Sequence, residues 1–200
     1  MRVLFIGNSH TYYNDMPQIF AEICRQAGTD TEVTMLTHGG KGWDFHINEP
    51  EIAFNIRYGH YDAVILQHTA HPMGDLDVMA DCGRRLISLV KEANARPVLY
   101  MTWTRKEDGA AAQPNMSTPY ISLSKETGSE LAPVGNAWWT FHEMMPDAEL
   151  YHTDDRHASP AGSRLAAYTI ASVVLNINPI ELPGDSEQDI CMKKAIAQVL

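Results

Sequence analysis

The sequence VLFIGNS at residues 3–9 joins an apolar run to a sharp turn. Val3 to Ile6 are consecutive β-forming residues, which is typical of a strand covered on both faces in a parallel sheet. Beyond the turn, apolar residues recur at helical spacing, namely Met16, Ile19, Phe20 and Ile23. The chain is therefore predicted to pass from a first strand, through the turn, into an amphipathic helix over about residues 14–25 that packs back on the sheet.

Ser9 lies in this turn, at the carboxyl end of the predicted strand. Open α/β sheets bind ligands at this edge, because helix N-termini and loop amides converge there. A second interpretation is that Ser9 only caps the helix that follows. Asp154 and His157 favour the first interpretation, because a nucleophilic serine needs a base to accept its proton and an acid to orient that base. The sequence thus offers Ser9, His157 and Asp154 as a candidate triad.

The rest of the chain alternates short apolar runs with helical periods. It predicts a three-layer α/β/α sandwich with a flavodoxin-like parallel sheet of about five strands. Further strands are expected at 31–37, 61–66, 97–101 and 133–137, and further helices at 49–57, 77–95, 116–131 and 159–175. Residues 1–182 are interpreted as one catalytic domain, with 183–200 as a helical extension of it. Residues 106–118 are interpreted as a surface loop or flap over the site.

Composition narrows the class of protein. A formal charge of −10 over 200 residues argues against a nucleic-acid or anionic-membrane partner, since phosphate backbones are bound by Lys and Arg clusters. Cys24, Cys82 and Cys191 are scattered and odd in number, which favours free thiols in a reducing compartment. No apolar stretch is long enough to span a bilayer, and Met1-Arg2 leads directly into the first strand. The expected location is cytoplasmic.

Two segments resemble the SGNH, or GDSL-like, hydrolase superfamily. FIGNSHTYYNDMP at residues 5–17 resembles its first motif block, in a bacterial branch related to carbohydrate acetylesterases, and Asp154-x-x-His157 resembles its last. The resemblance extends over about residues 1–180. It implies that Ser9 is the nucleophile, His157 the base and Asp154 the acid. The three-residue spacing favours Asp154 over Asp155.

The resemblance also implies an oxyanion hole. Its members use the backbone N–H of the serine, a glycine N–H after the second strand and a side-chain amide after the third. GGKGWD at residues 39–44 resembles the glycine block, with Gly42 as the best match and Gly40 as the alternative. Gln67 stands where most members carry Asn, and its carboxamide is the same group on one more methylene. Ser9, Gly42 and Gln67 are therefore the expected donors.

Residues near the predicted strand ends are candidates for contact with substrate: His10, Trp43, His68 and Trp103. Packing in the core is the alternative for the tryptophans. His68 and His71 are three residues apart, but no Cys or acidic partner accompanies them, so neither a metal nor another cofactor is expected.

The function expected from the resemblance is hydrolysis of short-chain carboxylic esters through an acyl-enzyme. The expected substrate is an O-acetyl group on a carbohydrate or a small molecule. One alternative is a thioesterase or a lysophospholipase-like hydrolase, and another is a non-catalytic carbohydrate-binding protein of the same fold. Phosphate binding by the glycine loop is disfavoured, because the Gly-x-x-x-x-Gly-Lys pattern is absent.

Overall fold

The computed structural model describes residues 1–200 and has a central sheet of five parallel strands. The strands are β1 (Arg2–Gly7), β2 (Glu32–Thr37), β3 (Ala63–Leu66), β4 (Arg96–Tyr100) and β5 (Glu130–Ala132). Their order is β2-β1-β3-β4-β5, the order of flavodoxin-like sheets. The predicted fold class is confirmed, and the carboxyl ends of all five strands meet at one edge.

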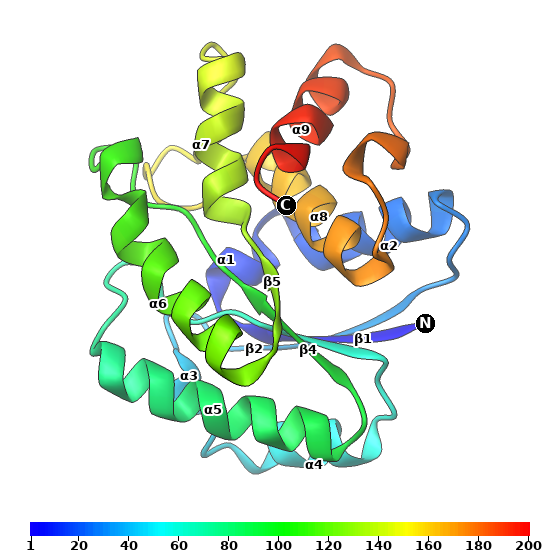
Figure 1. Cartoon of the computed structure of the whole chain (residues 1–200), viewed down its shortest axis with the longest axis vertical. Coiled ribbons are helices and arrows are strands. Elements are labelled where there is room, and N and C mark those ends of the chain that lie inside the picture. The colour runs from blue at the N-terminus through cyan, green and yellow to red at the C-terminus, as the bar shows by residue number, and fades with distance from the viewer.

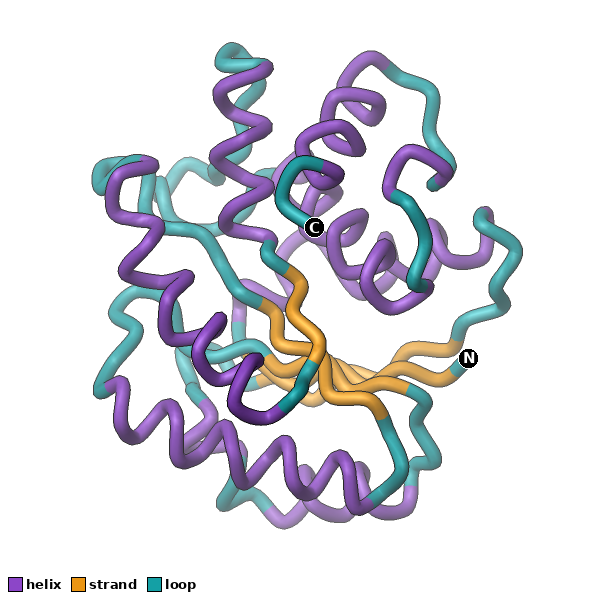
Figure 2. The backbone as a smooth tube through the Cα atoms, in the orientation of Figure 1, coloured by secondary structure: helices purple, strands orange, loops and turns teal.

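Helices cover both faces of the sheet (Figure 1). The helices are α1 (Ser9–Tyr12), α2 (Met16–Gln26), α3 (Trp43–His46), α4 (Pro50–Tyr58), α5 (Leu76–Glu92), α6 (Gln113–Thr127), α7 (Val134–Met144), α8 (Pro160–Leu175) and α9 (Glu187–Ala197). Short 3-10 turns occupy Tyr13–Asp15, Ala110–Ala112 and Pro179–Glu181. Helices α3 to α6 lie on one side of the sheet and α2, α7, α8 and α9 on the other, and Figure 2 shows the sheet between the two layers.

The strands supply side chains to two separate cores because successive residues of a strand point to opposite faces. Val3 and Phe5 of β1 pack in the core under α2 and α8, whereas Leu4 and Ile6 pack in the core over α5. All four side chains are fully buried. An apolar run with no polar alternation is therefore what this position in the sheet requires.

The predicted strand at 133–137 is wrong. Gly128 adopts a left-handed conformation at φ +65° and ends α6 at Thr127, four residues earlier than the helical period suggested. The next residues are then free to pair with β4 as β5 (Glu130–Ala132), and α7 begins directly after Pro133. The predicted loop at 106–118 is shorter than expected, because α6 already begins at Gln113. A proline in the first turn of α6 favours this early start.

The C-terminal segment packs on the same layer as α7 and α8. Met192, Ala195 and Ile196 of α9 are fully buried in the core that also contains α8. Arg164 of α8 forms a two-pronged ion pair with Asp189 of α9, with N–O distances of 2.5 and 3.1 Å. Across the described chain, no helix combines the length and the apolar character needed to cross a membrane.

Candidate active site

The turn after β1 presents Ser9 at the carboxyl edge of the sheet. Gly7 ends β1, and a Cβ atom there would lie 2.3 Å from Thr11 Oγ1 and 2.6 Å from Gln67 Oε1, so only glycine fits. Asn8 then caps α1, since its side chain accepts a hydrogen bond of 3.1 Å from the His10 N–H. Ser9 is the first residue of α1, and its backbone N–H has no acceptor within the helix.

Ser9, His157 and Asp154 lie in line. His157 Nε2 is 2.7 Å from Ser9 Oγ, and His157 Nδ1 is 2.5 Å from Asp154 Oδ2. Asp155 lies elsewhere: its side chain is 62% exposed and faces the Lys106 ammonium at 3.9 Å. The two carboxylates that sequence placed side by side are thus separated, and only Asp154 reaches the histidine.

Hydrogen bonds hold the Asp154 carboxylate in its ionised form. Partial desolvation acts to raise the pKa of Asp154, but donors from the His157 ring and from the His157 and Arg156 backbone amides outweigh it. The pKa of Asp154 is therefore well below its ordinary range. A carboxylate that stays ionised at neutral pH can orient the His157 ring and stabilise its protonated form.

The loop that carries these two residues is closed by strand-like pairing. Tyr151 and Ala158 form an antiparallel bridge, and the His152 N–H donates to the His157 carbonyl at 2.8 Å. Inside the loop, the Trp103 indole N–H donates to the Arg156 carbonyl at 3.0 Å. These contacts fix the loop backbone against the carboxyl edge.

The ring of His157 lies between two other rings. Tyr13 stacks on it nearly in parallel, at 4.1 Å between ring centroids and 11° between planes, and His10 lies 4.9 Å away. Asn14, at φ +52°, fixes this arrangement by donating to the Ala158 carbonyl and the Ser163 hydroxyl, both at 2.9 Å. Sequence reasoning had no signal for the stack, because Tyr13 and His157 are far apart in the chain.

A cavity of 190 Å³ lies at Ser9. It is lined by Asn8, Ser9, His10, Gly40, Thr69, Ala70, His71, Pro72, Arg156 and His157. Gly40 is therefore the glycine of the 39–42 loop at this cavity, whereas Gly42 lines a neighbouring cavity of 640 Å³. Of the two candidate glycines, Gly40 lines both cavities and Gly42 lines only the larger one.

The Gln67 side chain lies behind the Ser9 turn and does not line the Ser9 cavity. Its side chain is fully buried, its Oε1 accepts from the Asn8 N–H at 2.8 Å and from the Thr11 hydroxyl at 3.0 Å, and its Nε2 donates to the His68 carbonyl. Both ends of the amide are used within the protein. Gln67 thus supports the turn that carries Ser9 from behind and points no donor into the cavity.

The two tryptophans expected to contact substrate belong to the core, and that expectation is corrected. Trp43 and Trp103 are both fully buried. Trp103 stacks on Trp138 at 4.0 Å, and the Trp43 backbone N–H donates to His68 Nδ1 at 3.0 Å. An indole without exposed surface cannot form a wall for a ligand.

The two expected histidines differ in position. His68 is buried and joins two loops, accepting from Trp43 and donating through Nε2 to the Met73 carbonyl at 3.0 Å, and burial lowers its pKa. His10 lines the Ser9 cavity. Burial, followed by the nearby His71 and His157 rings, lowers the pKa of His10 to about 3, so its ring is neutral at physiological pH.

Sequence reasoning missed two residues of the cavity wall. Arg156 carried no signal in the sequence, and His71 was considered only as a possible metal partner of His68. His71 lines the cavity, and burial, followed by the positive charge of Arg105, lowers its pKa to about 4. No group of three or more His, Cys, Asp or Glu side chains in the chain is arranged to hold a metal ion.

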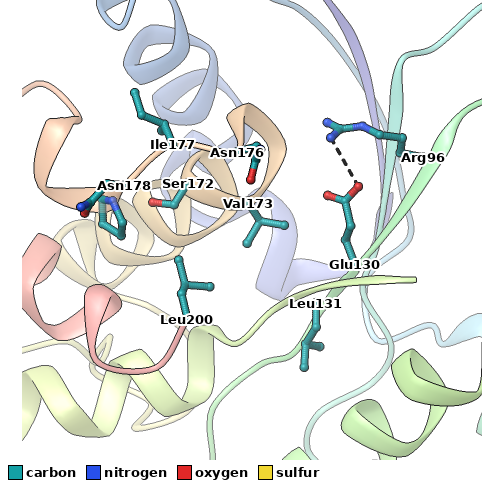
Figure 3. Close-up of a pocket in the computed structure, with 10 residues that line it drawn as sticks. Arg96, Glu130, Leu131, Ser172, Val173, Asn176, Ile177, Asn178 and Leu200 are labelled. Atoms are coloured by element: carbon teal, nitrogen blue, oxygen red, sulfur yellow. Dashed lines mark ion pairs between the residues drawn. The ribbon is translucent and has the colours of Figure 1, made fainter. Parts of the chain in front are cut away.

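A second region of the molecule is hollow but carries no comparable chemistry. A cavity of 620 Å³ lies between α8 and the first residues of β4 and β5, where Arg96 and Glu130 form an ion pair of 3.3 Å (Figure 3). This is the amino edge of the sheet, opposite Ser9. The smaller cavity at the carboxyl edge is therefore the candidate active site.

Solved structures with known descriptions share this fold. A proposed SGNH hydrolase from Slackia heliotrinireducens is 28% identical, with a TM-score of 0.73 over 86% of this chain and 98% of its own. A DUF4886 family protein from Bacteroides uniformis is 15% identical, with a TM-score of 0.78 over 100% of this chain and 94% of its own. An acetylxylan esterase from Geobacillus stearothermophilus is 13% identical, with a TM-score of 0.64 over 86% of this chain and 93% of its own.

Sequence comparison adds no further relative. No protein-family model and no curated protein matches the chain. The structural matches include an SGNH hydrolase, a GDSL-like lipase and esterases, and they support an ester hydrolase at the level of the fold.

Proposed function

We propose that the chain hydrolyses short-chain carboxylic esters with Ser9 as nucleophile, because it belongs to the SGNH/GDSL-like hydrolase superfamily. The observation that carries the proposal is the continuous contact from Ser9 Oγ through His157 to Asp154, at 2.7 and 2.5 Å. A serine hydroxyl becomes a useful nucleophile when a neighbouring base can accept its proton as it attacks.

The proposed reaction has two halves. Ser9 Oγ attacks the ester carbonyl carbon while its proton moves to His157 Nε2, and the protonated His157 then gives that proton to the departing alcohol oxygen. The acyl group stays on Ser9. Water, deprotonated by His157, attacks the acyl-enzyme, and Ser9 recovers its proton as the carboxylic acid leaves. Asp154 stays ionised throughout and stabilises the positive charge on His157.

The developing oxyanion needs donors already in position. In this proposal they are the backbone N–H groups of Ser9 and Gly40. Ser9 offers an N–H at the start of α1, and Gly40 lines the same cavity from the opposite loop. The positive φ of Gly40, +70°, supports this assignment because it lets a loop backbone approach a ligand closely.

The polar lining of the cavity favours a short acyl group. A volume of 190 Å³, walled mostly by polar side chains and loop backbone, leaves no long apolar channel beside Ser9. An acetyl ester fits this space, and the acetylxylan esterase among the structural matches supports acetyl groups on a carbohydrate as the substrate. The cavity does not favour a thioesterase or lysophospholipase-like activity on long acyl chains.

The test is hydrolysis of 4-nitrophenyl esters from acetate to decanoate by the wild type and by Ser9→Ala. The proposal expects kcat/KM to be highest for acetate or propionate and to fall with each longer chain, and it expects no turnover above background in the variant. A maximum at octanoate or decanoate would favour the lipase-like alternative. Turnover that persists in Ser9→Ala would remove the proposed mechanism.

A further inference from the structure

Three cavities adjoin one another along the carboxyl edge of the sheet. The Ser9 cavity shares Gly40, Thr69 and Pro72 with the cavity of 640 Å³. On its other side it shares Ala70, His71, Pro72 and Arg156 with a cavity of 400 Å³. Ser9 therefore lies between two arms of one groove, which we name the acidic arm and the arginine arm.

The two arms differ in charge. The acidic arm carries three carboxylates, Asp44, Glu49 and Asp75, against one ammonium, Lys41. The arginine arm carries Arg105, Asp108 and Arg156. A groove with opposite charge on either side of its reactive centre distinguishes the two ends of a substrate.

Arg105 contributes little free charge to its arm. Its guanidinium donates to both carboxylate oxygens of Asp108, at 2.8 and 3.1 Å, and lies 2.7 Å from a Glu107 oxygen. Asp108 is neutralised in turn by the same contact. The internal pairing of Arg105 with two acidic neighbours leaves Arg156 as the unpaired charge of the arm.

Arg156 has a fixed backbone and a free side chain. Its N–H donates to Asp154 Oδ1 at 3.1 Å, and its carbonyl accepts from the Trp103 indole at 3.0 Å. No protein carboxylate lies within 4.0 Å of its guanidinium, in a chain whose formal charge is −10. The neighbouring rings of His10 and His71 are neutral, so they neither repel nor replace this cation.

We infer that the arginine arm binds a carboxylate of the ester substrate, with Arg156 as its ligand. The inference rests on the proposed function and specifies its substrate class: an ester that carries an anionic group to one side of the scissile bond. A guanidinium suits this task because its planar fork matches the two oxygens of a carboxylate. Arg156 follows Asp154 and Asp155 in the loop that positions His157, so substrate charge is recognised beside the reacting atoms.

The experiment uses matched pairs of esters that differ only in charge. One pair, 4-acetoxybenzoate and 4-acetoxybenzamide, carries the difference on the alcohol side. The other, the 4-nitrophenyl monoesters of adipic acid and adipamic acid, carries it on the acyl side. We expect the wild type to favour the anionic member of at least one pair by up to about tenfold in kcat/KM, which is the size of a charge-assisted hydrogen bond to the exposed Arg156 side chain.

Three variants assign that preference. Arg156→Ala is expected to bring the ratio of the two kcat/KM values close to one, mainly through KM, and Arg156→Lys to restore part of it. Arg57→Ala is the matched control, because it removes an exposed arginine at the C-terminal end of α4 and leaves the groove intact. Added salt should reduce the wild-type ratio, since a charge pair that involves the exposed Arg156 is screened.

The outcomes separate this inference from the proposed function. A wild-type ratio near one in both pairs, or a preference that survives Arg156→Ala, would overturn the carboxylate site while esterase activity stands. Absence of turnover with all four esters, or turnover that persists in Ser9→Ala, would overturn the proposed function and the inference with it.

Discussion

The turn that carries Ser9 and the loop that carries His157 are built differently. The turn is embedded in the core, because Gly7 and Asn8 are buried. The fully buried Gln67 side chain accepts a hydrogen bond from the Asn8 N–H. The loop lies at the surface, where the side chains of His157 and Asp154 are 21% and 38% exposed. The proposed nucleophile is thus positioned by the fold itself, whereas the proposed base is positioned by a few local contacts.

This difference separates stability from activity. Changes in the turn disturb packing and lower the free energy of unfolding, because buried contacts are lost or strained. Changes in the loop alter the chemistry and leave the cores intact, since neither Asp154 nor His157 packs in them. Single substitutions in each region test whether stability and activity can be separated in this way.

Asp154→Asn carries the largest expected effect. The neutral amide can no longer stabilise a protonated His157 or enforce its orientation, so we expect kcat for 4-nitrophenyl acetate to fall by about 10³- to 10⁴-fold. The melting temperature of Asp154→Asn should stay within a few degrees of that of the wild type. Asp155→Asn is the matched control and should keep kcat within about twofold, because Asp155 faces Lys106. Equal losses in both variants would contradict the assignment.

Gly7→Ala tests the turn. The added methyl would lie 2.3 Å from Thr11 Oγ1 and 2.6 Å from Gln67 Oε1, so we expect a loss of about 3 kcal/mol or more in the free energy of unfolding. Urea denaturation followed by circular dichroism measures it. Gly39→Ala is the control, because its nearest new neighbour is the Tyr12 hydroxyl at 3.2 Å. Comparable stability of the two variants would mean that the turn is not held as tightly as described.

Local sequence patterns predicted the features of the fold and site that depend on neighbouring residues. The VLFI run specified β1, and the order of apolar runs and helical periods specified a parallel sandwich, since both depend on local patterns. Motif spacing predicted that Ser9, Asp154 and His157 act together, and the structure brings these three side chains into contact. β5 was misplaced because the end of α6 depends on the left-handed Gly128, which periodicity does not reveal.

The remaining site residues depend on three-dimensional contacts. A carboxamide at a strand end can face a cavity or the protein interior, and Gln67 faces the interior, where it accepts from Asn8 and Thr11. In the sequence alone, nothing distinguishes Tyr13 and Arg156 from ordinary surface residues. Their positions beside His157 follow from how α1, the 3-10 turn and the 150–159 loop meet.

Tyr13→Leu should have a smaller effect than either change above. Loss of the parallel ring at 4.1 Å removes both the orientation of His157 and a π face against its protonated form, which together are expected to lower kcat about tenfold with little change in KM. Tyr13→Phe keeps the ring and should retain most of the activity. If Tyr13→Phe lowers kcat as much as Tyr13→Leu does, the contribution of Tyr13 to kcat comes from its hydroxyl and not from the stacked ring.

Acid should produce the smallest effect. The folded-state pKa of Asp154 is below its ordinary value of 3.8, so the stability it contributes is present above that pH and is lost as pH falls below it. The difference in free energy of unfolding between wild type and Asp154→Asn should therefore be constant near neutral pH and shrink in acid. It should stay below about 1 kcal/mol, since the carboxylate is exposed to solvent. A difference that grows in acid would contradict the direction of the pKa shift.

The central claim is that Ser9 becomes acylated. The most direct measurement is mass spectrometry of the protein quenched in acid within the first turnovers with 4-nitrophenyl acetate, followed by peptide mapping. The account predicts an acetyl group on the peptide that contains Ser9, absent in Ser9→Ala and accumulating more slowly in His157→Ala. Ester hydrolysis by the wild type with Ser9 unmodified, or an acetyl group on another residue that turns over at the catalytic rate, would contradict it.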